Sequence, residues 1–154
     1  MITLKKGDIA PSFTVKNQDG KRISLSDFKA KKLVLFFYPK ASTPGCTNEA
    51  CNLSDNYEYF QSKGYEILGV SADSEKRQSN FRNKYKFPYD LLADENLEVI
   101  KAYGVWGLKK FMGKEYEGIH RTTFVIDESG IIEQVIEKVK TKDHTNQLLI
   151  DERG

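Results

Sequence analysis

The stretch that decides the fold is residues 33–46, LVLFFYPKASTPGC. Its first six residues form a continuous apolar run with aromatic and β-branched side chains, and Pro39 ends the run. A run of this kind is typical of a strand that is buried on both faces of a parallel or mixed sheet. The loop that follows contains Pro44 and Gly45 and leads directly to Cys46. The pattern therefore predicts a central strand with a cysteine just beyond its carboxyl end.

The rest of the chain alternates between helical and strand patterns. Glycines, capping residues and apolar spacing predict helices at residues 46–63, 74–86, 96–103 and 143–152. Period-two or continuous apolar patterns predict strands at residues 66–71, 122–127 and 131–140. The turn Asp127-Glu128-Ser129-Gly130 makes the last two an antiparallel hairpin. Upstream, residues 12–16 and 22–25 flank an Asp-Gly turn, which predicts an N-terminal β-hairpin.

This order of elements indicates a fold class. A βαβ unit followed by a helix, a hairpin and a last helix predicts an α/β thioredoxin-like sandwich, with a central mixed sheet flanked by helices. Periodicity alone also allows other α/β arrangements. Because the sequence has no linker and no internal repeat, we expect a single domain over residues 1–154.

Composition excludes several classes of protein. The 24 Lys and Arg residues nearly balance the 22 Asp and Glu residues, and the signs are interspersed, so we expect no nucleic-acid partner. The longest apolar run is too short for a membrane helix, and the first residues lack the apolar segment of a signal peptide. We therefore expect a cytoplasmic protein without a membrane partner. We also expect a monomer rather than a stable oligomer.

Two cysteines in a reducing compartment are too few for a disulfide scaffold, so their reactivity becomes the question. Cys46 should lie in the first turn of a helix, where unpaired N–H groups and the helix dipole favour a thiolate. The alternative is that Cys46 is a small buried apolar residue. Its position after a Thr-Pro-Gly loop and before polar residues favours a reactive thiol.

Several segments resemble a known family. Residues 39–46, PKASTPGC, resemble the Pro-x-x-x-Thr-x-x-Cys signature of peroxiredoxins. Residues 47–51 (TNEAC), 105–107 (VWG) and 118–124 (GIHRTTF) are similar to the peroxiredoxin Q subfamily, also called bacterioferritin comigratory protein. The resemblance covers nearly the whole chain. It implies an antioxidant thiol peroxidase that reduces hydrogen peroxide and organic hydroperoxides and needs no metal or organic cofactor.

The resemblance also implies roles for individual residues. Cys46 is the nucleophile, which attacks a peroxide oxygen and becomes a sulfenic acid. Thr43 contacts the thiolate and the peroxide, and Pro39 shields the site. Arg121 supplies a cation that cannot lose its proton. The residues expected to bind peroxide are Thr43, Gly45, Cys46 and Arg121.

By the same resemblance Cys51 condenses with the sulfenic acid to form an intramolecular disulfide. In an intact helix, residues five apart have Cα atoms roughly 8–9 Å from each other, whereas a disulfide requires about 4.4–6.8 Å. If the pair crosslinks, the first turns of the helix must unwind in each cycle. If Cys51 is instead a core residue, an external thiol must resolve the sulfenic acid. The expected reductant is thioredoxin or a similar dithiol protein, with glutaredoxin as an alternative.

Other cysteine chemistries fit the sequence less well. A thioredoxin-type oxidoreductase requires Cys-x-x-Cys spacing, which is absent here. A zinc site would use Cys46, Cys51, His120 and His144, but these lack the short paired spacings of zinc modules, so both histidines are expected to be surface or hydrogen-bonded structural groups. Trp106 and Phe111 are expected to pack in the core rather than to form an apolar rim. A non-enzymatic alternative stays open, namely a redox sensor or chaperone-like binding protein in which the same cysteines change shape to signal to a partner.

Overall fold

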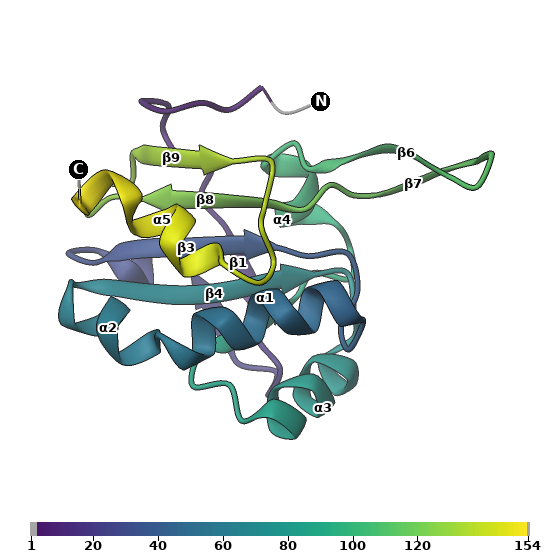
Figure 1. Ribbon diagram of the computed structural model, residues 1–154, viewed down its shortest axis with the longest axis horizontal. Helices are drawn as coiled ribbons and strands as arrows, with labels where there is room; N and C mark the ends of the chain where they lie inside the picture. Colours follow the sequence, from purple (N-terminus) through teal and green to yellow (C-terminus); the bar gives the residue numbers. More distant parts are fainter. Residues whose placement is uncertain (1–2, 154) are drawn as a thin grey trace.

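The structure is a computed structural model that describes the backbone of residues 3–153 and the side chains of residues 3–148. Within this part of the chain, the central sheet has five strands in the order β5-β4-β3-β8-β9 (Figure 1). The central strand β3 is parallel to β4 and antiparallel to β8. The strands are β3 (Lys32–Phe37), β4 (Tyr65–Ser71), β5 (Asp90–Ala93), β8 (Thr122–Ile126) and β9 (Ile132–Ile136). The predicted mixed sheet is confirmed.

Helices cover both faces of this sheet. Alternate residues of β3 point to opposite sides, as the pleat requires, and each side has its own apolar cluster. On one side Val34 and Phe36 pack in a cluster with residues of α1, α2, α3 and α5, and Figure 1 shows α1 and α5 in front of the sheet. On the other side Leu35 and Phe37 join α4 and the N-terminal segment. The helices are α1 (Pro44–Asp55), α2 (Tyr57–Ser62), α3 (Glu75–Tyr85), α4 (Glu98–Ala102) and α5 (His144–Arg153).

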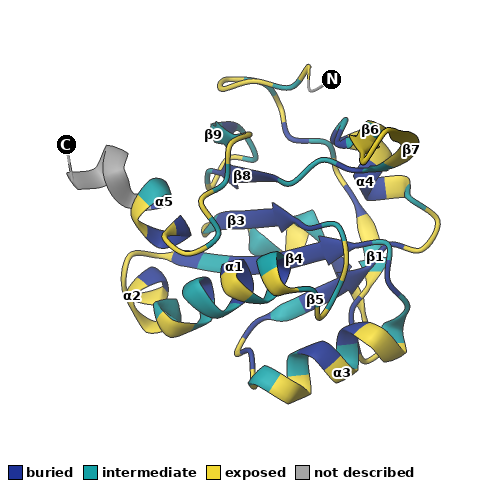
Figure 2. Cartoon of the chain, turned by 45° about the vertical axis from the view of Figure 1, so that its right-hand side comes forward, coloured by how far each residue is buried: buried dark blue, intermediate teal, exposed yellow. Residues whose placement is uncertain are grey.

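Burial follows this layering. Figure 2 shows β3 and β4 as buried ribbons between partly exposed helices. From Leu33 to Tyr38 every residue is buried, which is why the segment carries no polar alternation. The N-terminal hairpin is present as β1 (Thr14–Lys16) and β2 (Arg22–Ser24), followed by the short 3-10 helix η1 (Leu25–Phe28).

The helix expected at residues 46–63 is divided in the structure. Asn56 (φ −110°, ψ 13°) ends α1 and precedes α2. The apolar spacing hid this break, because Leu53 before it and Phe60 after it are both fully buried. The predicted strand 131–140 is also shorter than expected, since β9 ends at Ile136.

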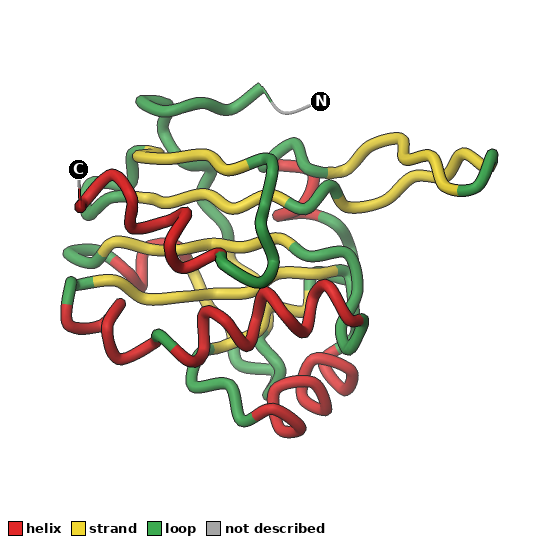
Figure 3. Tube along the Cα trace, viewed as in Figure 1, coloured by secondary structure: helices red, strands yellow, loops and turns green. Residues whose placement is uncertain are grey.

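Two further features were missing from the prediction. One is the short edge strand β5, and the other is a hairpin of β6 (Trp106–Phe111) and β7 (Lys114–Ile119). The hairpin projects from the body of the protein (Figure 3), and its tip residues Met112 and Gly113 have positive φ values of 52° and 79°. Among the described residues, no helix has the length and apolar character needed to cross a membrane.

Candidate active site

Cys46 lies in the first turn of α1, which follows β3 after a short loop. Thr43 is the N-cap residue in extended conformation, and Pro44 occupies the first helical position, where its missing N–H costs nothing. The thiol is only 1% exposed and packs in the apolar cluster beneath α1. Cys46 is therefore a buried group at a helix N-terminus, next to a loop.

Arg121 approaches Cys46 from the sheet. It directly precedes β8, and the antiparallel pairing of Thr122 with Phe37 places it beside the loop that leaves β3. Its Nη2 donates to Cys46 Sγ at 3.3 Å, and its Nη1 lies 2.7 Å from Glu49 Oε1. The guanidinium thus bridges a thiol and a carboxyl that are one turn apart on α1.

Gly45 makes room for this cation. A Cβ atom at this position would lie 3.3 Å from Arg121 Nη2, a distance that would press on the guanidinium. Burial alone would lower the pKa of Arg121, but the charges of Cys46 and Glu49 and the hydrogen bonds to them raise it. Arg121 therefore stays charged beside the sulfur.

A second cation faces the same region from β6. Lys109 donates from Nζ to the Ile119 carbonyl at 2.9 Å. Burial and repulsion from Arg121 lower the pKa of Lys109, while Cys46 acts in the opposite direction. The base of the β6–β7 hairpin therefore contributes charge to the surroundings of Cys46.

Thr43 and Pro39 both lie in the loop that joins β3 to α1. The Thr43 hydroxyl donates to the Lys40 carbonyl at 2.8 Å, so its hydrogen is engaged within the loop. Pro39 is half-buried directly after β3. The loop is fixed from outside by Asp73, whose Oδ2 accepts from the Ala41 N–H at 2.8 Å.

Glu49 is a site residue that sequence reasoning missed. Its side chain is fully buried, and burial raises the pKa of Glu49 to about 7, although Arg121 opposes the shift. A polar residue three positions after a helical cysteine lies on the same face of the helix. This spacing, together with the need of a buried arginine for a counter-ion, is the sequence signal that could have identified Glu49.

Comparisons with known proteins show which family the chain belongs to. The sequence profile of the AhpC/TSA family matches residues 6–135. The chain belongs to this family. It is 46% identical to "Peroxiredoxin Bcp" of Escherichia coli (strain K12) over 149 residues, which cover 97% of this chain and 96% of the relative. It is 44% identical to "Peroxiredoxin Bcp" of Bacillus subtilis (strain 168) over 148 residues, which cover 96% and 94%.

Solved structures are similar over the same length. A structure of Xanthomonas campestris peroxiredoxin Q has a TM-score of 0.87 and 32% identity, with 99% of this chain and 96% of that chain covered. Peroxidoxin BcpB of Mycobacterium tuberculosis has a TM-score of 0.86 and 34% identity, with 97% of each chain covered. The predicted peroxiredoxin family and thioredoxin-like fold are confirmed, and the protein is an antioxidant thiol peroxidase.

The peroxiredoxin fold does not bring Cys51 to Cys46. Both cysteines are free thiols and belong to the continuous helix α1, so their Cα atoms are roughly 8–9 Å apart. Cys51 is half-buried, and burial together with the nearby Asp55 raises the pKa of its thiol. Tyr89 donates to the carbonyl of Ala50 at 2.6 Å, which holds this part of α1 in place.

The remaining candidates have structural surroundings. Trp106 is half-buried against the core and donates to Glu117 at 2.8 Å, whereas Phe111 is 66% exposed, so the expectation of core packing is wrong for Phe111. His120 is half-buried, and His144 is buried and hydrogen-bonded. Within the described residues, no group of three His, Cys, Asp or Glu side chains has an arrangement that could hold a metal ion.

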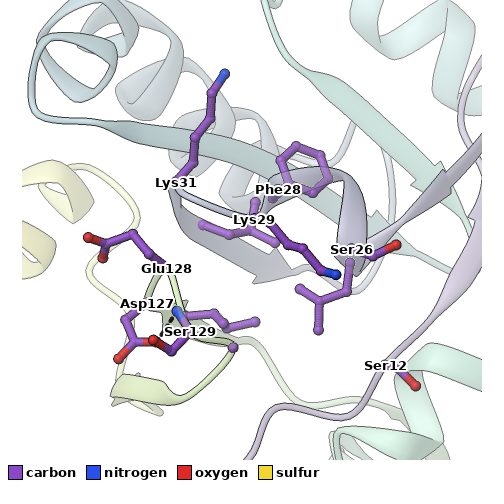
Figure 4. Close-up of a pocket in the computed structure, with 12 residues that line it drawn as sticks. Ser12, Ser26, Phe28, Lys29, Lys31, Asp127, Glu128 and Ser129 are labelled. Atoms are coloured by element: carbon purple, nitrogen blue, oxygen red, sulfur yellow. Dashed lines mark hydrogen bonds between the residues drawn. The ribbon is translucent and has the colours of Figure 1, made fainter.

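The peroxiredoxin also has a cavity of about 440 Å³ between the η1 segment and the β8–β9 turn (Figure 4). Leu33 and Ile126, which pair at the start of β3, form part of its wall. Cys46 follows the opposite end of β3. This cavity is therefore remote from the thiol.

Proposed function

We propose that this peroxiredoxin reduces hydrogen peroxide and organic hydroperoxides with Cys46 as the nucleophile. The observation that carries the proposal is the 3.3 Å contact from Arg121 Nη2 to Cys46 Sγ at the start of α1. The thiolate attacks one peroxide oxygen, the O–O bond breaks, and Cys46 becomes a sulfenic acid. The other oxygen takes up a proton and leaves as water or an alcohol.

The neighbouring groups stabilise the charge that develops on the leaving oxygen. Arg121 and the Cys46 N–H are fixed donors and need no rearrangement. We assign the Thr43 hydroxyl to the peroxide, which it reaches by exchanging its bond to the Lys40 carbonyl. Gly45 keeps space for the guanidinium, and Pro39 limits access of water to the sulfur. The bacterioferritin comigratory protein of Xanthomonas campestris, whose solved structure is 31% identical in sequence, has alkyl peroxide reduction activity, which supports organic hydroperoxides as substrates.

In the second step Cys51 attacks the sulfenic sulfur, a disulfide forms and water is released. The step requires α1 to unwind, because the intact helix separates the two cysteines. Unwinding breaks the Tyr89 bond to Ala50 and the contacts that Asn52 makes with α5. The free-energy cost of breaking these contacts keeps α1 folded until the sulfenic acid has formed.

Thioredoxin, or a similar dithiol protein, is the reductant that we propose for this disulfide. Its low potential of about −270 mV favours reduction of a disulfide that lies in an unwound, exposed segment. We further propose that the chain works as a monomer, with residues 1–154 as one domain, in the cytoplasm, where such reductants keep thiols reduced.

The test is a coupled assay with thioredoxin, thioredoxin reductase and NADPH on wild type, Cys46→Ser and Cys51→Ser. We expect continuous NADPH oxidation for the wild type and none for Cys46→Ser. Cys51→Ser should consume one equivalent of peroxide and then stop. A wild type that stops after one equivalent is a sensor and not an enzyme. Full turnover by Cys51→Ser would reject Cys51 as the resolving thiol.

A further inference from the structure

Two buried titratable groups next to the site have no part in the steps above. Glu49 on α1 and His144 at the start of α5 are both 0% exposed. Glu49 Oε1 pairs with Arg121, whereas Glu49 Oε2 has no hydrogen-bond partner and lies 3.5 Å from His144 Nε2. A chain of contacts therefore runs from α5 through Glu49 and Arg121 to Cys46.

The surrounding bonds determine which nitrogen of His144 carries the hydrogen. The Gln147 amide is oriented from both sides, because its Nε2 donates to the Lys138 carbonyl at 2.9 Å and its Oε1 accepts from the Lys140 N–H at 2.7 Å. The same Oε1 lies 2.9 Å from His144 Nδ1. Since an amide oxygen only accepts, Nδ1 must donate.

A neutral His144 with its hydrogen on Nδ1 presents a lone pair at Nε2. The Thr123 hydroxyl lies 2.8 Å from this lone pair and also interacts with the Glu49 carboxyl, but its single hydrogen can serve only one of the two. With an ionised Glu49, one hydrogen is shared by two buried acceptors, the Nε2 lone pair and a carboxylate oxygen. A protonated Glu49 supplies the second hydrogen, so that neither acceptor is left without a donor.

We propose that His144 is a positioning residue of the peroxidase site, which acts by keeping the proton on Glu49 so that the charge of Arg121 is directed at Cys46. The inference rests on the proposed role of Cys46 as the nucleophile. When Glu49 is neutral, the guanidinium has one anionic neighbour, the thiolate. When Glu49 ionises, two anions share the cation, and the thiolate is less stabilised.

The electrostatic surroundings agree with this assignment. Burial raises the pKa of Glu49 to about 7, and bonds from Arg121 and Thr123 oppose the shift only in part. Burial lowers the pKa of His144 to about 4, with the Gln147 bond opposing and Arg121 adding to the shift.

Of the other charged or titratable groups, Cys46 on α1 and Lys109 on β6 interact with Arg121. Tyr89, the residue before β5, interacts with Glu49, and burial raises its pKa well above the ordinary value. Tyr89 therefore stays neutral, and Lys109, like Arg121, is a cation. His144 is the group in contact with Glu49 Oε2 that offers an acceptor.

The kinetic test follows the rate constant of the reduced protein with hydrogen peroxide, by competition with a reporter peroxidase, from about pH 5 to 8.5. We expect an inflection from Glu49 near pH 7, with the rate constant falling above it. Glu49→Gln should abolish this inflection. His144→Asn, which keeps a donor for Gln147 but cannot reach Glu49, should move it down by roughly half to one pH unit, the equivalent of one hydrogen bond.

The matched control is Thr145→Ala. The Thr145 hydroxyl contacts the Asn52 carbonyl at 3.3 Å, so its loss loosens α5 without touching Glu49. We expect the same inflection as in the wild type. An inflection that moves equally in both variants would assign His144 a purely structural role.

A second readout does not depend on activity. The ¹⁵N shifts of His144, one of two histidines in the chain, report its tautomer and charge. We expect a neutral ring with the hydrogen on Nδ1 down to about pH 5. An imidazolium at pH 6 overturns the inference even if the peroxidase works. A wild type that fails to react with peroxide overturns the proposed function, while this NMR result stands on its own.

Discussion

The pair of Glu49 and His144 predicts an unusual dependence of stability on pH. In the unfolded chain at about pH 5.5 the carboxyl is ionised and the imidazole is protonated, because their ordinary pKa values are 4.5 and 6.5. In the folded protein the pKa of Glu49 is about 7 and that of His144 is about 4. Folding therefore moves a proton from His144 to Glu49 with no net uptake or release.

Each group alone makes stability depend on pH, and the two directions are opposite. The raised folded pKa of Glu49 gives a contribution that is complete below pH 4.5 and is lost as pH rises towards about 7. The lowered folded pKa of His144 gives a contribution that is complete above pH 6.5 and is lost as pH falls towards about 4. Each corresponds to roughly 3 kcal/mol in the free energy of unfolding. In the wild type the two offset each other.

Single substitutions should expose the separate slopes. Subtracting the wild-type free energy of unfolding at each pH removes the contributions of all other titratable groups. The free energy of unfolding of Glu49→Gln minus that of the wild type should rise by roughly 3 kcal/mol between pH 4.5 and 7. The difference for His144→Asn should fall over nearly the same range, since the variant lacks the contribution that His144 makes at higher pH.

The assay is urea unfolding of the reduced protein, with a phosphine reductant present, at five or so pH values. Equal m-values among the variants would show that the same surface is exposed on unfolding. Thr145→Ala serves as the control, and its difference from the wild type should not vary with pH. Differences that are flat, or that slope in the same direction for both variants, would refute the proton transfer.

Other substitutions test single contacts. In Gly45→Ala the new Cβ presses on Arg121 Nη2, so we expect peroxide reduction to slow about three- to tenfold, and an unchanged competition rate would contradict this. Arg121→Lys keeps the charge but cannot bridge Cys46 and Glu49, which predicts a loss of about 100-fold in the same assay. Tyr89→Phe removes the hydroxyl that donates to the buried Ala50 carbonyl, which keeps its helical N–H partner. Stability in urea should fall by about 0.5–1.5 kcal/mol, and quenched mass spectrometry should show faster disulfide formation. Amide exchange should increase across α1 when the wild type is oxidised but not when Cys51→Ser is oxidised, and equal protection in both redox forms would exclude unwinding.

The fold was predictable where burial leaves a pattern in the sequence. The run from Leu33 to Tyr38 identified the central strand because both faces of β3 lie in the core. The β6–β7 hairpin was missed because it projects into solvent, and its strands carry charged residues at positions that the core does not constrain. The break at Asn56 was missed because α1 and α2 bury residues of the same face on either side of it.

The site was predictable only in part. The position of Cys46 followed from the strand, the loop and Pro44, but Arg121 is 75 residues away and was assigned by resemblance alone. Glu49 stands in a polar stretch, and its three-residue spacing from Cys46 places it on the same helix face without showing that its carboxyl is buried against a cation. His144 begins a helix whose place on the molecule is set by tertiary contacts, among them the bonds of Thr145 to Asn52.

The division of the helical segment at Asn56 has a consequence for the redox cycle. The hydrogen-bond ladder of α1 already ends at Leu53 and Ser54, whose carbonyls accept from the Asn56 N–H. A rearrangement that starts at Cys46 thus meets a natural boundary before it reaches α2. Phe60 can stay packed on β4 while the twelve residues of α1 change conformation. In the proposed disulfide mechanism, α1 therefore changes shape in every cycle while the remainder of that core stays assembled.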